Sequence, residues 1–205
     1  MYKKFLYFPV YTLLITQTFG EDKVCIATDG SGKLVSKKTF DLCPAGYKSV
    51  YSNMKGHNGW DIVAGSATEV YASDKGKVIE VQTEEARGLG VGILHEFEGR
   101  YFKTRYWHLK SIAVKLGQDV PLGQFIGLAD NTGYSTGDHL HFEVKETDKD
   151  GNTLYNDNGY LGALNPALVT EMIFVLKIQS LEMLIKRAKE QVAQIVQRLA
   201  NLLRK

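Results

Sequence analysis

Four of the five histidines in this chain lie in three short patterns whose side chains could bind a metal or move a proton. His57 and Asp61 stand four residues apart in GHNGWD, and His108 lies in YWHL. His139 and His141 stand two apart in HLHFE, so both side chains share one face of a strand. Imidazole nitrogen and carboxylate oxygen are preferred zinc ligands, and a catalytic zinc has three protein ligands and one open position for water. The patterns predict a zinc site, although spacing alone does not choose between His139 and His141.

The fifth histidine, His95, stands alone beside Glu96 and is interpreted as a packed or surface residue. The zinc hypothesis depends on the conjunction of the three patterns, because any single histidine is more typical of a structural role. Neither a His-Glu-x-x-His helix motif nor a phosphate-binding glycine loop competes with them. These residue types therefore predict hydrolysis by metal-activated water.

The order of the motifs resembles a known family. GHNGWD is followed by YWHL and then by VKLGQDVPLGQFIGLADNTGYSTGDHLHFEV, and this series is similar to the lysostaphin-type zinc metallopeptidases. The similarity runs from about Ile15 to Val144. Members of that family hydrolyse cross-links or stem peptides in bacterial peptidoglycan. The resemblance therefore implies peptidoglycan as substrate, Zn²⁺ as cofactor, and a mostly antiparallel sheet with a groove that holds the zinc on its floor.

The same resemblance assigns roles to individual residues. It implies that His57, Asp61 and His141 are the zinc ligands, and that His108 and His139 are catalytic histidines that do not bind the metal. Two stretches depart from the family pattern. Ala129-Asp130 replaces a Val-Gly-like pair, and Asp138 stands where proline often precedes HLHFE. Both changes leave the chemical groups of the site in place, so we expect them to affect groove shape and substrate preference.

The expected mechanism uses zinc to acidify a water molecule and to polarise the scissile carbonyl. His108 or His139 would act as the general base, since a histidine with a pKa near its usual value of about 6.5 suits proton transfer. Tyr134 is a candidate substrate contact. Glu143, two residues from His141, is a candidate support for that ligand.

Other functions remain open at this point. The main alternative is a non-catalytic peptidoglycan-binding, activator or structural module of the same fold, but all five site positions are filled. A structural or oligomerising wall protein is compatible with the enzyme interpretation. A D-alanyl dipeptidase or carboxypeptidase would have a wider spacing than the four residues between His57 and Asp61.

The composition predicts a mainly β fold. The chain has 205 residues, 44% of them hydrophobic and 23% charged, with 20 glycines and 11 tyrosines. Short β-rich runs separated by Gly, Asp or Asn predict an antiparallel sheet, and we expect residues 1–165 to form the peptidase domain. A segment around 21–55 is predicted to be an inserted loop at the groove wall.

Two cysteines, Cys25 and Cys43, enclose part of this insertion. They are too few for a disulfide framework or a four-thiolate zinc site. Synthesis in the cytoplasm would favour free thiols at first. A disulfide between them is expected to be dispensable for catalysis, because neither cysteine belongs to the predicted site.

After Asn165-Pro166 the hydrophobic period changes, and residues 166–205 are predicted to form a long amphipathic α-helix. Its apolar seam alternates steps of four and three residues and comprises Phe174, Ile178, Leu181, Ile185, Ala188, Val192, Ile195, Leu199 and Leu202. Such a coiled-coil seam predicts self-association. A cationic amphipathic helix could instead contact anionic membranes.

The net charge of +2 and the absence of a Lys/Arg run argue against a nucleic acid partner. Lys3 and Lys4 precede an apolar run, as in a signal peptide, but its Tyr, Phe and Thr content favours a first strand. We therefore expect a protein that acts on the bacterial cell wall and is made in the cytoplasm, in the manner of a phage endolysin. Secretion is the alternative.

Overall fold

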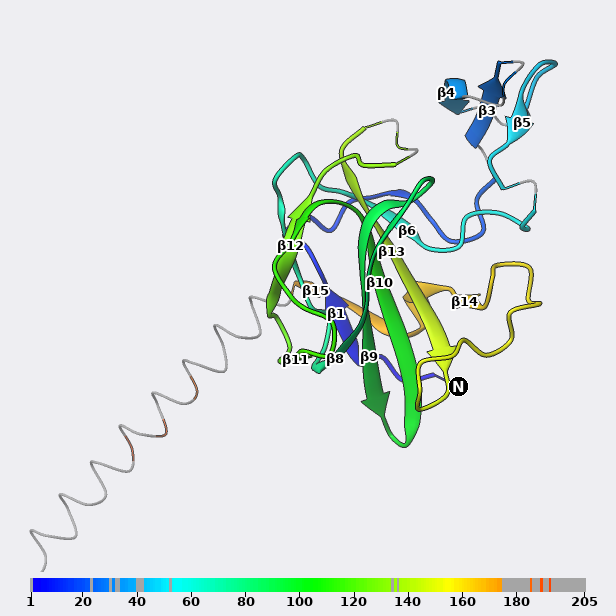
Figure 1. The fold of residues 1–205 in the computed structure, drawn as a ribbon. Coiled ribbons are helices and arrows are strands. Elements are labelled where there is room, and N and C mark those ends of the chain that lie inside the picture. Colours follow the sequence, from blue (N-terminus) through cyan, green and yellow to red (C-terminus); the bar gives the residue numbers. More distant parts are fainter. Residues whose placement is uncertain are drawn as a thin grey trace, which may run out of the picture.

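The computed structural model describes residues 2–22, 24–29, 31, 34–39, 43–51, 53–133, 135 and 137–174, together with Ile185, Lys189 and Val192. Three β-sheets form within these residues (Figure 1). The ten-stranded sheet contains β2 (Ile15–Gln17), β6 (Trp60–Val63), β7 (Glu69–Tyr71), β8 (Gly76–Glu84), β9 (Gly88–Phe97), β10 (Arg100–Ile112), β11 (Asp119–Val120), β12 (Phe125–Ala129), β13 (His139–Thr147) and β14 (Ala163–Leu164). The smaller sheets contain β3 (Val24–Thr28), β4 (Leu34–Thr39) and β5 (Lys48–Ser49), and β1 (Leu6–Phe8) and β15 (Thr170–Phe174).

The long strands at the centre of the main sheet run antiparallel in the order β8-β9-β10-β13-β6. A two-residue turn joins β9 to β10 at Glu98 and Gly99, whose φ angles are 50° and 75°. Two positive φ values suit a type I′ turn, whose twist matches that of the flanking strands. The turn sets the register of this pair from Phe97 opposite Arg100 onward.

Side chains along β13 alternate between the core face of the sheet and an opposite, polar face, which we call the functional face. Leu140, Phe142 and Val144 are fully buried in the hydrophobic core cluster. His141 and Glu143 lie between them in the sequence and project from the opposite face, because successive strand side chains alternate. The mainly antiparallel sheet expected from the sequence is therefore present, and its period of two gathers the polar side chains on one face.

The expected first strand is also present. β1 and β15 pair in parallel, with Leu6 opposite Thr170, and the Leu6 and Phe8 side chains are fully buried. The Phe8 ring lies 5.9 Å from the Trp60 ring, which ties this small sheet to β6 of the main sheet.

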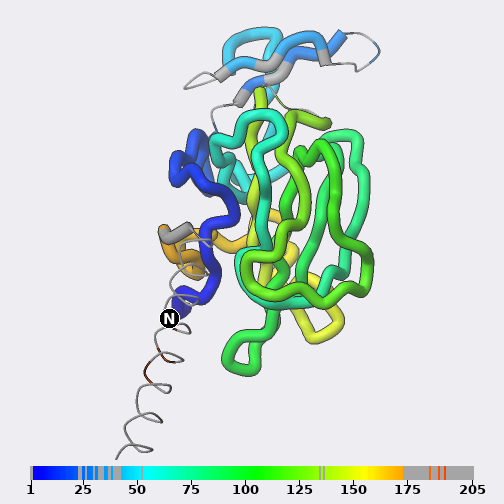
Figure 2. The backbone as a smooth tube through the Cα atoms, turned by 90° about the vertical axis from the view of Figure 1, so that its left-hand side faces the viewer, coloured from blue at the N-terminus to red at the C-terminus, as the bar shows by residue number. Residues whose placement is uncertain are grey.

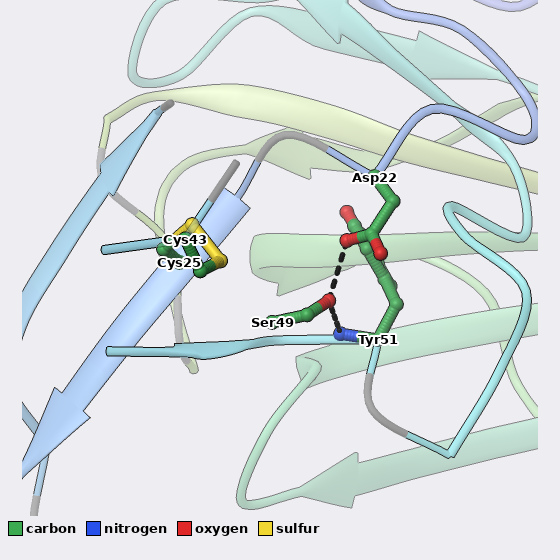
Figure 3. Close-up of a disulfide and its surroundings, with 5 residues drawn as sticks. All are labelled: Asp22, Cys25, Cys43, Ser49 and Tyr51. Carbon is green, nitrogen blue, oxygen red and sulfur yellow. Dashed lines mark hydrogen bonds between the residues drawn. A yellow bond between two sulfur atoms is a disulfide. The ribbon is translucent and has the colours of Figure 1, made fainter. Parts of the chain in front are cut away.

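The small sheet of β3, β4 and β5 lies apart from the main sheet, as both views show (Figure 1, Figure 2). A disulfide joins Cys25 to Cys43 across 18 residues (Figure 3). Beside it, the Ser49 hydroxyl donates to the Asp22 carboxylate and accepts the Tyr51 backbone N–H at 3.0 Å. The predicted inserted segment is therefore a disulfide-bonded unit whose last strand leads directly to Tyr51.

The predicted C-terminal helix is wrong. Pro166–Leu168 form a single 3-10 turn, and β15 follows where the helix was expected to begin. No helix of seven or more residues occurs in the described part of the chain. Parallel pairing with β1 supplies backbone hydrogen bonds to Thr170–Phe174, and such tertiary pairing overrides a helical periodicity that propensity supports only weakly.

The self-association and anionic membrane contact expected of this segment stay predictions. Most of the seam predicted for 175–205 lies outside the described residues, where only Ile185, Lys189 and Val192 are placed. Among the described helices, none has the length and apolar character that a membrane span requires.

Removal of the disulfide tests whether the small sheet depends on it. The double variant Cys25→Ser/Cys43→Ser should lose about 3 kcal/mol of local stability, because the bond restricts the unfolded loop. Limited trypsin digestion should cut residues 24–49 faster than in the parent, with zinc content unchanged. Loss of zinc from a double variant whose main sheet still melts cooperatively would instead make the small sheet part of the metal site.

Candidate metal centre and active site

Three side chains converge at one point on the functional face. His141 on β13 stands directly opposite Asp61 on β6, and His57 precedes β6 by three residues. His141 Nδ1 lies 2.8 Å from Asp61 Oδ1, and His57 Nε2 lies 2.9 Å from His141 Nδ1 and 3.1 Å from Asp61 Oδ1. The three atoms form a compact triangle, and these residues are the group in the described chain that could hold a metal ion.

The outward hydrogen bonds set the tautomers of both histidines. His57 Nδ1–H donates to the Thr18 carbonyl at 3.2 Å, and His141 Nε2–H donates to Glu143 Oε1 at 3.3 Å. The lone pairs of His57 Nε2 and His141 Nδ1 then face each other and the carboxylate oxygen of Asp61. Three acceptors this close together require a cation or a proton between them. Zinc bonds of about 2.0–2.2 Å in a tetrahedral site would separate the ligand atoms by about 3.4 Å, so this donor set fits zinc after a small expansion.

Glycine at position 59 is required by the close approach of β13. A Cβ there would lie 2.5 Å from the Phe142 carbonyl oxygen and 3.1 Å from the His141 ring. Any side chain would therefore push His141 away from its position. This contact explains why a glycine separates His57 and Asp61 in the GHNGWD pattern.

The two other histidines of the motifs lie beside this triangle. His139 Nε2 is 3.5 Å from Asp61 Oδ1, and its Nδ1–H donates to the Gly137 carbonyl at 2.8 Å. His108 Nδ1–H donates to the Thr132 carbonyl at 2.6 Å. The His108 and His139 rings are 4.6 Å apart between centroids. Both rings are oriented by Nδ1, so Nε2 is the proton-accepting nitrogen in each.

His108 occupies a strained backbone position. Its φ is 62°, at a register shift in the β9–β10 pairing, and a non-glycine residue there costs roughly 1–2 kcal/mol. Two backbone hydrogen bonds stabilise this strained conformation. The His108 N–H donates to the Arg87 carbonyl at 3.1 Å, and the Asp130 N–H donates to the His108 carbonyl at 2.9 Å. The register shift acts as a β-bulge. In a regular strand His108, two residues after Tyr106, would point to the same face as Tyr106.

Burial and neighbouring charges shift the pKa values of the site residues in opposite directions. Burial, with smaller contributions from His141 and His139, lowers the pKa of His108 to about 3. Burial also disfavours charge on His141, but hydrogen bonds with Asp61 and Glu143 outweigh it and raise the pKa to about 9. Asp61 is half-buried, which disfavours its charge, yet the two histidines hold its pKa well below the usual value. In the metal-free site a proton on His141 therefore balances the Asp61 charge.

A cavity of about 300 Å³ opens over these groups. Tyr51 and Met54 form one wall, and Ala86 and Arg87 form another. The Tyr51 ring centroid is 5.6 Å from that of His57. Sequence reasoning missed these wall residues, because no spacing pattern links them to the histidine motifs.

Two further contacts lie beneath the triangle of His57, Asp61 and His141. Glu143 is fully buried and accepts from His141 and from Asn58 Nδ2, the latter at 2.9 Å. The predicted support of His141 by Glu143 is therefore confirmed as a contact. Asn58 was missed, although its place next to His57 in the GHNGWD pattern was a usable signal.

The remaining predicted residues have mixed outcomes. The structure brings His57, Asp61, His108, His139 and His141 together. His95 lies in the core, where it bonds the Lys75 carbonyl at 2.8 Å and Thr104 Oγ1 at 2.7 Å. Its interpretation as a packed histidine is confirmed. Tyr134, the candidate substrate contact, lies outside the described residues.

Ser135 lies in a sequence pattern that can mark a serine nucleophile, since Gly133, Ser135 and Gly137 match Gly-x-Ser-x-Gly. Its hydroxyl donates to the Gly137 carbonyl at 2.6 Å and lies 3.1 Å from His139 Nδ1. A nucleophile elbow requires a strand-to-helix turn, whereas this segment connects β12 to β13. Ser135 is therefore placed to orient His139.

The antiparallel sheet thus carries two histidines and an aspartate around one point that could hold a metal ion. Residues 55–153 match the model of peptidase family M23, so this part of the chain is an M23 peptidase domain. The lysostaphin-type resemblance is thereby confirmed.

Individual relatives agree with this assignment. Peptidoglycan DD-endopeptidase ShyA of Vibrio cholerae is 46% identical over 88 residues, which are 43% of this chain and 20% of ShyA. Glycyl-glycine endopeptidase ALE-1 of Staphylococcus capitis is 35% identical over 106 residues, 51% of this chain and 29% of ALE-1. The crystal structure of a zinc containing peptidase from Vibrio cholerae superposes with a TM-score of 0.50 and 32% identity, over 75% of this chain and 39% of that one. The chain thus spans less than two fifths of each.

Zinc binding should depend on pH through the proton on His141. With a metal-free pKa of about 9, that residue must release its proton when a metal binds, so lower pH weakens binding. The apparent zinc affinity should fall about tenfold for each pH unit between about pH 8 and about pH 6. Competition with a chelator of known proton affinity measures this. An affinity independent of pH over that range would show that His141 is already neutral in the metal-free protein.

Proposed function

We propose that this protein is a zinc-dependent endopeptidase that hydrolyses peptide bonds of bacterial peptidoglycan at the cell wall. The observation that carries the proposal is the triangle of acceptor atoms on His57, Asp61 and His141, with separations of 2.8–3.1 Å, and two more histidines beside it. A module that only binds its ligand has no need of two histidines oriented toward a metal site. Catalysis uses all five groups.

His57 and Asp61 would hold zinc through Nε2 and a carboxylate oxygen, and His141 through Nδ1. When bound, zinc lowers the pKa of a water molecule and polarises the scissile carbonyl. The Glu143 carboxylate accepts from His141 at 3.3 Å, which orients this ring and raises the basicity of its other nitrogen.

His108 and His139 are the groups placed to transfer the proton from the attacking water to the leaving amine. Each donates through Nδ1 to a backbone carbonyl, so each offers Nε2 as an acceptor toward the reacting groups. The low pKa of His108 makes that ring a poor proton acceptor, so His139 Nε2 is favoured to take a proton from the attacking water and to donate it to the departing amine. In its protonated form the ring also donates a hydrogen bond to negative charge that develops on the carbonyl oxygen.

The substrate class is supported by the relatives' names. ShyA is a peptidoglycan DD-endopeptidase and ALE-1 a glycyl-glycine endopeptidase, and both are similar to this chain. The common chemistry is hydrolysis of an amide in a peptide, which is the reaction proposed here.

Alanine substitutions separate the metal ligands from the proton-transfer groups. His57→Ala, Asp61→Ala and His141→Ala should lose both zinc and peptidoglycan hydrolysis, because each removes one of three donors. His108→Ala and His139→Ala should keep zinc while hydrolysis falls about 10²–10⁴-fold, the usual contribution of a general acid–base group. Metal analysis of each purified variant, with release of soluble peptides from peptidoglycan, measures both effects.

A chelator provides the matched control. The parent protein should lose hydrolysis on chelation and regain it when zinc is added back, whereas His57→Ala should not respond to zinc. Full zinc occupancy in His141→Ala would contradict the proposed ligand set, and undiminished hydrolysis in both His108→Ala and His139→Ala would contradict the proton-transfer roles.

A further inference from the structure

The functional face continues beyond the metal site along β10 and β13. Arg105 on β10 stands opposite Glu143 on β13, and Lys103 stands opposite Lys145. Side chains two or four residues apart on a strand point to the same face. Glu143 and Lys145 are two and four residues from His141, and Arg105 and Lys103 are two and four residues from Trp107, which pairs with His141. All four side chains therefore lie on the face of His141. The functional face therefore changes from imidazoles at the metal site to basic side chains farther along.

These basic residues line a second cavity of about 570 Å³. Glu80 from β8 contributes to one side and the segment 150–156 to another. Arg87 lines this cavity and the one over the metal site. The two cavities are thus neighbours that share a wall. We call the set Arg87, Lys103, Arg105 and Lys145 the basic cavity cluster.

Positive charge predominates inside the cluster. Its four cations surround only two buried or half-buried carboxylates, Glu80 and Glu143. Asp150 also lines this cavity, whereas Glu84, which pairs with Arg87 at 2.9 Å, lines the cavity over the metal site. The residues that line this cavity include four cations and two carboxylates, Glu80 and Asp150, and the buried Glu143 next to Lys145 makes the count four to three. One additional negative charge would balance the cavity.

The ion pairs also leave donor capacity for another acceptor. Lys145 Nζ donates to the Leu161 carbonyl at 2.7 Å but lies 3.7 Å from Glu143 Oε2, and Arg105 Nη1 lies 3.9 Å from the same oxygen. That buried oxygen has no hydrogen-bond partner among the described residues. Burial, with the nearby cations Arg105, Arg87 and Lys103, lowers the pKa of Lys145 to about 8 despite Glu143. An acceptor entering the cavity would relieve this repulsion.

We propose that the basic cavity cluster binds a free carboxylate of the peptide substrate. Lys145 is four residues from His141 along one strand, about 13 Å at about 3.3 Å per residue, and Arg105 is about half as far. An extended peptide covers about 3.5 Å per residue. The bound carboxylate therefore belongs to a residue two to four positions from the cleaved bond.

This inference rests on the proposed function and narrows its substrate. Stem peptides and the cross-links between them carry free carboxylates, whereas a bridge made of glycines has uncharged side positions. Charged hydrogen bonds from buried side chains such as Lys103 and Lys145 discriminate strongly between a carboxylate and its neutral amide. The preferred substrate is thus a stem-peptide linkage with a free carboxylate near the scissile amide.

Binding of two matched peptides to the zinc-loaded protein tests the proposal. The probes are the stem tetrapeptide N-acetyl-L-Ala-γ-D-Glu-L-Lys-D-Ala and the same peptide with both carboxylates amidated. The acid should bind the parent protein at least about tenfold more tightly than the amide, as charge-assisted hydrogen bonds predict. In Lys145→Gln and in Arg87→Gln this preference should fall below about threefold. Titration calorimetry measures the affinities, and thermal melting checks each fold.

Lys115→Gln is the matched control, because Lys115 is exposed and lies in the turn between β10 and β11, away from the cluster. It should keep the full preference for the acid. Equal binding of acid and amide by the parent, or an undiminished preference in both cluster variants, would overturn the proposal. Since binding needs no cleavage, a preserved preference in a protein that hydrolyses nothing would count against the proposed function alone.

Discussion

The pairing of β6 with β13 is the interaction on which the site depends. It sets Asp61 opposite His141, and the short Gly59 lets the His141 ring lie against the preceding loop, where His57 completes the triangle. Three acceptors are then held within 3.1 Å of one another by backbone hydrogen bonding on one side and by Glu143 on the other. The stability of the sheet thus keeps three acceptor atoms close together, although their mutual repulsion is relieved only when a cation or a proton lies between them.

Glu143 connects the two parts of the functional face. It is fully buried, accepts from His141, and is surrounded by Arg87, Arg105 and Lys145 at 3.6–3.9 Å. Neighbouring cations and the His141 hydrogen bond outweigh burial and hold its pKa far below the usual value. A buried carboxylate that stays ionised beside His141 needs such counter-charges, and the same counter-charges make the adjoining cavity positive.

Interpretation of the sequence succeeded where local spacing has direct geometric meaning. A two-residue step along a strand places His139 and His141 on one face whatever the rest of the fold. The heptad pattern after Pro166 failed for the opposite reason. Within the span predicted as helix, Thr170–Phe174 pair with β1 instead, and that partner is more than 160 residues away in the chain.

The sequence by itself determined the residue types of the site, its mainly β setting and, through the family resemblance, the choice of His141 over His139. Only the tertiary structure decided which groups surround them: Tyr51 from the disulfide-bonded segment, Arg87 shared by two cavities, and the carbonyls of Thr18 and Thr132 that select the histidine tautomers. The physical reason is that a periodic pattern specifies which side of a strand a residue occupies. The partner that it meets there depends on strand register and loop packing between distant segments, which no local spacing contains.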